Sequence, residues 1–274
     1  MDHKFLFELG VEEIPADLIF PALEQLRSGF EGVLAENNIS WGSIEAYSSP
    51  RRLAILIEGL PEQQAPREEQ VVGPPASRGL DSEGQPSQAA KGFARSQGID
   101  VTRLEPIQTE RGLYLGFNRQ VEGQPVREIL GNSLADRVRS LFWPRSMYWG
   151  ESRFRFIRPL RWYVALWDQA VVPFEFEGLR SGNLTRGHRF LGGQAIPIAA
   201  ADQYLEGLRE GFVLVDARER EQRIVKELES QLPDGLSLLE DAALLRTVIQ
   251  LNEYPSVLCG RFDEAFLEIP KEVL

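Results

Sequence analysis

The pattern of apolar and polar positions changes its period several times along the chain, and each change predicts a new element. Residues 4–10 have the composition of a strand, and a helix is predicted to begin near Pro15 and Asp17. The apolar residues of this helix recur at helical spacing: Ile19, Leu23, Leu26, Phe30, Val33 and Leu34. We therefore expect the helix to pack one face on a sheet.

Strand and helix periods continue to alternate in the next part of the chain. Residues 39–60 predict two strands broken at 48–50, and the second strand covers 53–57. A strand at 113–121 precedes a helix that Trp143-Pro144 ends. The apolar residues of that helix repeat every four positions: Val126, Leu130, Leu134, Val138 and Leu141.

Residues 61–89 depart from this alternation. They contain five prolines and three glycines among mostly polar residues, which predicts a long excursion and not a packed element. A short helix is predicted at 86–97, with Gly98 as its C-cap. Lys91 and Arg95 share one face of that helix, and such a face either touches nucleic acid or is merely solvated.

The densest mixture of arginine and aromatic residues lies between Arg153 and Phe190. Strand-forming residues cover 154–165 and 171–176, with a turn between them. Side chains alternate faces along a strand, so Arg153 and Arg155 are expected to point away from their phenylalanine neighbours. One face can then join a core while the other meets an anion.

The remaining chain is predicted to be mainly helical, with helices at 199–209, 216–232 and 238–251 before a strand at 256–259. The second helix opens with a capping box, Asp216 and Glu219.

The fold class predicted from these elements is α+β, with mixed or antiparallel sheets, packed helices and two or more subdomains. Residues 1–60 form an N-terminal segment that 110–190 completes. The excursion with its small helical insertion covers 61–109. The segment at 191–274 is predicted to be mainly helical and to end in a strand, and we expect its continuation to be missing.

Composition places the chain among globular proteins, since 43% of its residues are hydrophobic and 26% are charged. No apolar run approaches the roughly 20 residues that span a bilayer, and Glu8 falls where a signal peptide is apolar. A single cysteine, Cys259, excludes an intrachain disulfide and a cysteine-cluster metal site. We expect a cytoplasmic protein with no membrane partner.

The charge is distributed unevenly. The net charge is -11, which by itself argues against binding a polyanion. Residues 137–189, however, hold ten arginines, no lysine and four acids, a local charge of +6, whereas the other 20 basic and 37 acidic residues sum to -17. The basic segment is either an anion-binding surface or a solvated face whose arginines neighbour glutamates.

Few residues are candidates for catalysis. His3 and His188 are the only histidines, and no HExxH, GxSxG, Walker or GxGxxG motif occurs. The sequence therefore disfavours a self-contained hydrolase or nucleotide enzyme and indicates no catalytic or metal-binding residue. Glu12 and Glu13 resemble paired catalytic carboxylates, but adjacent glutamates before a helix are more often complements of its dipole.

Two arginine-rich positions remain open to more than one interpretation. Arg51 and Arg52, at a strand entry, can hold a phosphate or pair with acids on a neighbouring strand. The loop from Thr185 to Arg189 surrounds Gly187 with donor-rich side chains. It can clasp a phosphate or carboxylate, or it is a turn whose arginines bridge two domains. An editing-type hydrolase that uses His188 is a further hypothesis.

Eight short stretches occur in an order that resembles the β subunit of the two-subunit bacterial glycyl-tRNA synthetases. They are FELGVEEIPA (7–16), SPRRLAI (49–55), GPP (73–75), AKGFAR (90–95), MYWG (147–150), FRFIRPLRW (154–162), TRGHRF (185–190) and NEYPSVL (252–258). Each is a weak pattern alone, but the eight together cover nearly the whole chain in sequence.

The resemblance implies a role beside a catalytic partner. In that family the α subunit carries the active site that uses ATP and Mg²⁺, so no cofactor is expected on this chain. The β subunit is implied to recognise tRNA(Gly) and to complete an α2β2 enzyme. The candidate interface residues, facing tRNA or the partner subunit, are Arg51, Arg52, Arg155, Arg158, Arg161, Arg186, His188 and Arg189.

The family's β subunit continues for more than twice this length, through an HD-like region to an anticodon-binding domain. Neither region is present in these residues, so this chain alone is not expected to read the anticodon or to be catalytically active. The alternative function is a structural interaction module whose arginines are internal ion-pair partners and do not contact RNA.

Overall fold

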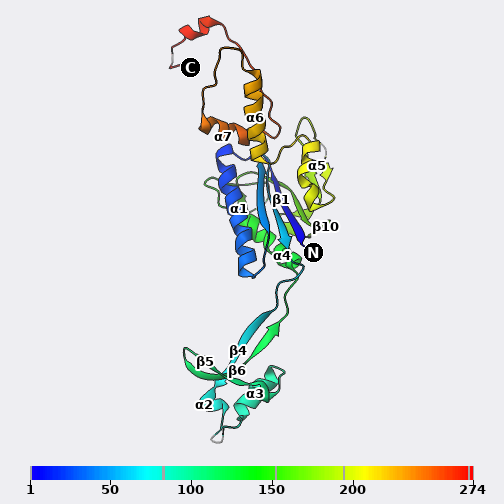
Figure 1. Ribbon diagram of the computed structural model, residues 1–274, viewed down its shortest axis with the longest axis vertical. Helices are drawn as coiled ribbons and strands as arrows, with labels where there is room; N and C mark the ends of the chain where they lie inside the picture. The colour runs from blue at the N-terminus through cyan, green and yellow to red at the C-terminus, as the bar shows by residue number, and fades with distance from the viewer. Residues whose placement is uncertain (1, 82–83, 152, 194, 271, 274) are drawn as a thin grey trace. The chain divides into compact units, whose positions relative to one another are not determined.

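The computed structural model describes residues 2–81, 84–151, 153–193, 195–270 and 272–273 (Figure 1). The chain forms two compact units, one made of residues 1–62 and 126–274 and the other of residues 63–125. These limits differ from the predicted ones, because residues 110–125 belong with the second unit and do not complete the N-terminal segment. Residues 82 and 83 of the predicted excursion lie outside the described residues.

A seven-stranded sheet forms the centre of the first unit in the described part of the chain. The strands run in the order β11-β12-β9-β1-β3-β2, and β10 adds to β9. The contact between β12 and β9 is parallel and the others are antiparallel, which confirms the predicted α+β class with mixed sheets. The strands are β1 (His3–Val11), β2 (Ser43–Ser49), β3 (Arg52–Leu60), β9 (Leu160–Trp167), β10 (Ala170–Val171), β11 (Glu175–Phe176) and β12 (Leu179–Gly182).

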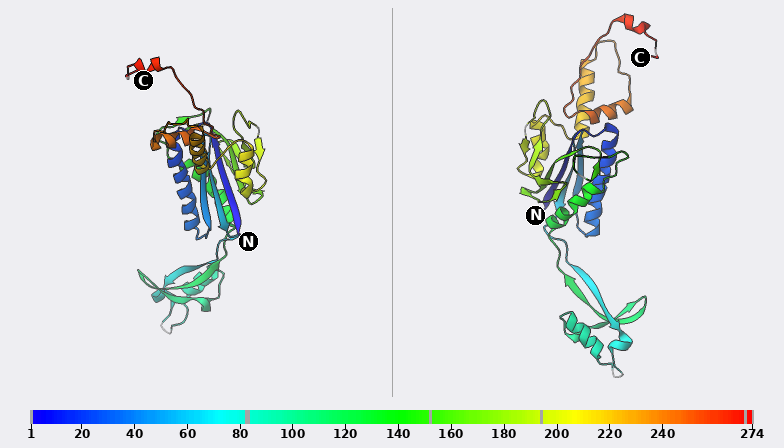
Figure 2. Two further views of the ribbon diagram at one scale, coloured as in Figure 1. Left: turned by 45° about the horizontal axis from the view of Figure 1, so that its top comes forward. Right: turned by 180° about the vertical axis from the view of Figure 1, so that it is seen from behind.

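Helices cover both faces of this sheet, as Figures 1 and 2 show. Helices α1 (Ala16–Glu36) and α4 (Val126–Arg139) pack on one face, where the apolar side chains of β1 at Phe5, Phe7 and Leu9 meet them. Helix α5 (Tyr204–Glu210) packs on the other face against Leu6. Because successive side chains of a strand point to opposite faces, Glu8 also points to the α5 side.

The basic segment is more broken than its sequence predicts. Pro159 lies between β8 (Arg155–Phe156) and β9, so one predicted strand becomes two. The predicted alternation holds, since Phe154 and Phe156 pack on the core while Arg153 and Arg155 are exposed. Strand β8 pairs with β7 (Met147–Tyr148), and β13 (Leu184–Arg186) pairs with β14 (Ala195–Pro197).

A buried arginine ties the C-terminal helices to the sheet. Arg220 of α6 (Ala217–Gln231) donates to the carbonyls of Ser48, Leu214 and Ile249 at 2.6–2.8 Å. Burial lowers the pKa of Arg220 to about 10. The carbonyl of Ile249 belongs to α7 (Ala242–Leu251), so a single guanidinium joins α6, α7 and the end of β2.

Two predictions for this region do not hold. Asp216 caps α6 through the amide of Arg218, but Glu219 pairs with Arg209 at 3.0 Å and does not close a capping box. Residues 256–259 form no strand, because α6 side chains satisfy the backbone there: Glu227 accepts from the Val257 amide at 2.9 Å and Gln231 donates to its carbonyl at 2.6 Å. Short 3₁₀ helices occur at Ala201–Gln203 and Glu264–Glu268.

The second unit is a packed element, contrary to the prediction for residues 61–89. Its sheet has the order β4-β6-β5, and helix α3 lies against β4. Gly73 allows the close contact, since a Cβ there would lie 2.5 Å from the Phe93 ring. The elements are β4 (Arg67–Pro75), α2 (Ala76–Gly79), α3 (Gln88–Ser96), a 3₁₀ turn (Val101–Arg103), β5 (Glu105–Thr109) and β6 (Gly112–Val121).

Helix α3 agrees with the predicted helical insertion, and Gly98 has the positive φ of 68° that a C-cap glycine adopts. Lys91 and Arg95 are exposed on it. Among the described residues, every helix falls short of the length and apolar character that a bilayer span needs.

We expect the first unit to fold without residues 63–125. The Val126 amide donates to the Glu62 carbonyl at 3.0 Å, so the two ends of the first unit already meet and a short Gly/Ser linker can join them. Circular dichroism during heating should show one cooperative transition for the linked variant. A broad, non-cooperative melt would contradict this prediction.

Candidate functional site

The two predicted arginines at the start of β3 are buried and pair with acids inside the protein. Arg52 has no exposed surface. Its guanidinium lies 3.0 Å from Glu253 and 3.8 Å from Glu8, and it also donates to Ser49 and Thr185 at 3.0 and 3.2 Å. Of the two interpretations for Arg52, phosphate binding and pairing with acids, the structure therefore shows the second.

Glu8 accepts hydrogen bonds from residues that are far apart in the sequence. Thr185 donates to it at 2.6 Å, and the Trp162 indole and the Tyr204 hydroxyl also donate to its carboxylate. Together with Arg52, these donors link β1, β3, β9, β13 and α5. A buried carboxylate requires such compensation, because desolvation of an unpaired charge is costly.

Glu8, Arg52, Thr185, Tyr204 and Glu253 form a buried cluster, and their contacts shift the pKa values of some members. Burial alone would lower the pKa of Arg52, but the Glu253 and Glu8 carboxylates raise it, so the guanidinium is charged. Burial, together with the adjacent Glu8, raises the pKa of Tyr204 well above its ordinary value. Tyr204 is therefore a neutral hydrogen-bond donor at physiological pH.

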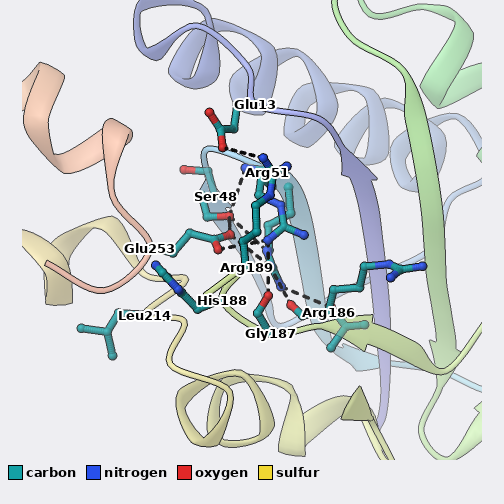
Figure 3. A network of polar contacts seen from close by, with 12 residues as sticks. Glu13, Ser48, Arg51, Arg186, Gly187, His188, Arg189, Leu214 and Glu253 are labelled. Atoms are coloured by element: carbon teal, nitrogen blue, oxygen red, sulfur yellow. Dashed lines mark hydrogen bonds and ion pairs between the residues drawn. The ribbon is translucent and has the colours of Figure 1, made fainter. Parts of the chain in front are cut away.

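Arg51 lies between this buried cluster and the surface. It is 8% exposed, contacts Glu253 at 3.5 Å and donates to the Gly187 carbonyl at 3.3 Å. Burial, and then the neighbouring charges of Arg52 and Arg189, lower the pKa of Arg51 against the opposing effect of Glu253. Figure 3 shows Arg51 among Glu253, Gly187 and Arg189.

At the surface, Glu12 bridges two arginines from different elements. Arg161 and Arg189 each approach its carboxylate at 2.7 Å, and Arg189 also lies 3.4 Å from Glu13. Partial burial opposes ionisation of Glu12, but the two arginines outweigh it and hold its pKa below the ordinary value. Glu12 and Glu13 are thus ion-pair partners of arginines in the basic segment. The sequence had suggested either paired catalytic carboxylates or complements of the helix dipole.

These residues line a cavity of about 450 Å³. Four of the predicted arginines meet there, and among the described lining residues Glu12 is the acidic one. The lining consists of Val11, Glu12, Arg51, Arg161, Trp162, Arg186, Gly187, Arg189 and Gly193.

The other predicted residues lie outside the cavity lining. Arg155 donates to the Ser146 carbonyl at 2.8 Å, and Arg158 donates to the Glu13 carbonyl at 3.0 Å. The ring of His188 accepts from the amides of Phe190 and Leu191, both at 3.2 Å.

The chemistry available at this site is recognition of an anion. No group of three or more His, Cys, Asp or Glu that can hold a metal ion occurs within the described residues. Since the His188 ring nitrogen Nδ1 serves as an acceptor for backbone amides, it orders its own loop, and this arrangement gives no support to hydrolysis by His188.

Sequence reasoning missed Glu8, Tyr204 and Glu253 as members of the site. Glu8 is the only charged residue in the interior of an otherwise apolar strand, and Glu253 lies within one of the recognised motifs. Both signals were present, but the partners of a buried charge depend on the tertiary structure.

Comparison with known proteins identifies the family. A family model described as "Glycyl-tRNA synthetase beta subunit" matches residues 5–274. The chain belongs to this family. The resemblance drawn from the eight motifs is thereby confirmed.

Three relatives illustrate the relationship, and each is named glycine–tRNA ligase beta subunit. The chain is 38% identical over 276 residues to the one from Syntrophus aciditrophicus, 42% over 275 residues to the one from Listeria monocytogenes and 38% over 275 residues to the one from Geobacter sulfurreducens. The matches cover 100% of this chain and 40% of each relative. The chain therefore spans less than half the length of these members of the glycyl-tRNA synthetase β-subunit family.

In this β-subunit fold, Arg52→Met is expected to lower the free energy of unfolding by about 3–5 kcal/mol, because Glu8 and Glu253 then lose their buried cation. Arg161→Met is the matched control. It removes a pair whose arginine side chain is 52% exposed and is expected to cost about 0–1 kcal/mol. Urea denaturation measures both values, and equal losses would contradict the assignment of Arg52 to the buried cluster.

Alkaline pH is expected to destabilise the fold through its buried tyrosines. Burial raises the pKa values of Tyr47, Tyr163 and Tyr204. A raised acid pKa means that the folded state retains protons that the unfolded state has lost, so stability should fall as pH rises above about 10. Denaturation across a pH series should show a smaller loss for Tyr204→Phe. Tyr148→Phe, which removes a tyrosine that is 60% exposed, is the control. An unchanged pH dependence in Tyr204→Phe would contradict the prediction.

Proposed function

We propose that this chain corresponds to the N-terminal part of a glycine–tRNA ligase β subunit and acts in protein biosynthesis. It contributes recognition of tRNA(Gly) and assembly with the catalytic α subunit in an α2β2 aminoacyl-tRNA synthetase. ATP and Mg²⁺ act on the α subunit, which charges tRNA(Gly) with glycine in the cytoplasm. The chain alone has no aminoacylation activity.

The observation that supports RNA recognition most directly is the arginine-lined cavity. Four guanidinium groups line it within a protein whose net charge is -11. Guanidinium groups match the geometry of phosphate oxygens, and phosphate contacts dominate the affinity of proteins for nucleic acids. Membership of the β-subunit family supplies the second, independent support.

A specific observation also favours the structural alternative for part of the predicted set. Arg52 is fully buried, and Arg51, Arg161 and Arg189 have glutamate partners. The carboxylate contacts of these arginines stabilise the fold whether or not a ligand is bound. The two functions therefore divide among residues: the buried arginines stabilise the site, and the exposed ones remain accessible to RNA or to the α subunit.

The decisive experiment combines tRNA binding and aminoacylation. Labelled tRNA(Gly) is titrated with the chain, alone and with the α subunit, from about 50 to 200 mM salt. The logarithm of the binding constant should fall linearly with the logarithm of the salt concentration, with a slope of about -0.9 for each phosphate neutralised. Glycylation by the α subunit is measured with and without the chain. Absent or salt-independent binding in both preparations would refute RNA recognition. Glycylation that rises on adding the chain without any tRNA binding would favour the assembly role alone.

A further inference from the structure

Arg186 differs from the other arginines of the cavity. Arg51, Arg161 and Arg189 each contact a glutamate, whereas within the described residues the Arg186 side chain has no carboxylate partner. Its guanidinium lies over the Trp162 ring, 5.7 Å from the ring centre. In Figure 3 this side chain lies apart from the group formed by Arg51, Arg189 and Glu253, and it lines the same cavity as the two arginines.

Among the described residues in and beneath the cavity, the arginines outnumber the glutamates by one. The buried and surface ion pairs join four arginines (51, 52, 161 and 189) to four glutamates (8, 12, 13 and 253). Arg186 lines the cavity as a fifth arginine outside these ion pairs. The balance of this group is +1, which a single phosphodiester neutralises. An anion in the cavity would also offset the repulsion among neighbouring guanidinium groups.

The backbone beneath Arg186 is fixed by the buried cluster. Arg52 donates to the Arg186 carbonyl at 2.8 Å, and Arg51 donates to the next carbonyl, that of Gly187, at 3.3 Å. Gly187 is packed so closely that a Cβ there would lie 2.1 Å from the Gly192 carbonyl oxygen. The side chain of Arg186 therefore extends from a held backbone at the end of β13, which reduces the backbone entropy that binding must overcome.

We propose that this cavity binds one phosphate group of the RNA backbone, with Arg186 as its principal ligand; this inference rests on the proposed tRNA recognition. The cavity, of about 450 Å³, has the size of a small-molecule site and exceeds the space that a single carboxylate needs. Trp162 is only 8% exposed and three arginines already lie over its ring, so it offers no surface on which a base can stack. The contact thus positions RNA and does not read its sequence.

The test compares Arg186→Gln with a matched control, Arg139→Gln. Arg139 is also a surface arginine over an aromatic ring, 5.2 Å from the centre of Phe176, but it has an acid partner in Asp136 and does not line the cavity. Labelled tRNA(Gly), and a tRNA of unrelated sequence, are titrated with the 274-residue chain across a salt series. Thermal melting verifies that each variant is folded.

Loss of one phosphate contact has a defined signature. Arg186→Gln is expected to reduce the salt slope by about 0.9 and to weaken binding about tenfold near 0.1 M salt, equally for both tRNAs. Arg186→Lys, which retains a cation, should preserve most of the slope, and Arg139→Gln should match the unaltered chain.

Four outcomes would overturn the inference. If the unaltered chain binds tRNA with a steep salt slope that Arg186→Gln does not change, the phosphate site is refuted while the proposed function stands. If Arg186→Gln weakens only association with the α subunit, the ligand is a protein carboxylate. The ligand is free phosphate if two results occur together. Orthophosphate must raise the melting temperature of the unaltered chain, but not that of Arg186→Gln, above the value in chloride of equal ionic strength. The salt slope of tRNA binding must also be the same for both proteins. Absence of tRNA binding by the unaltered chain, with and without the α subunit, would refute the proposed function and the inference together.

Discussion

A carboxylate in the middle of a sheet must be compensated by its neighbours, and the neighbours of Glu8 come from four separate segments. Trp162, Thr185 and Tyr204 donate to it, and Arg52 lies within ion-pair distance. These groups offset the cost of removing the Glu8 carboxylate from water. Its burial therefore couples β1 to the basic segment and to α5.

The same coupling explains why two kinds of arginine meet at the site. Arg52 uses its guanidinium to compensate Glu8 and Glu253 and also holds the Arg186 carbonyl. The inner arginine thus fixes the loop from which an outer arginine, Arg186, extends towards solvent. A positive surface within an acidic chain then follows from the arrangement of a few side chains and not from the overall composition.

Local patterns predicted what depends on local periodicity. The helix at Ala16–Glu36 and the strands around Phe5 and Ile55 followed from apolar spacing, and the eight ordered motifs identified the family. The second unit was not predicted to pack, because alanine and glycine give a weak apolar signal although they allow helix α3 to approach β4 closely. The arginines of the site were found from the local distribution of charge and from the family motifs, whereas the roles of Glu8 and Glu253 depend on partners distant in sequence, which no local pattern encodes.

Hydrogen exchange in the variant Arg52→Lys tests most directly whether the buried cluster holds the loop that follows Thr185 and Arg186. Lysine retains the charge but has one nitrogen, whereas Arg52 reaches Thr185 with one terminal nitrogen and Glu253 and the Arg186 carbonyl with the other. In the native loop the His188 amide donates to the Gly211 carbonyl at 2.8 Å, and the Gly192 amide donates to the His188 carbonyl at 2.9 Å. We predict that these two amides exchange faster in the variant while those of β1 stay protected. Unchanged exchange at His188 and Gly192 would contradict the account.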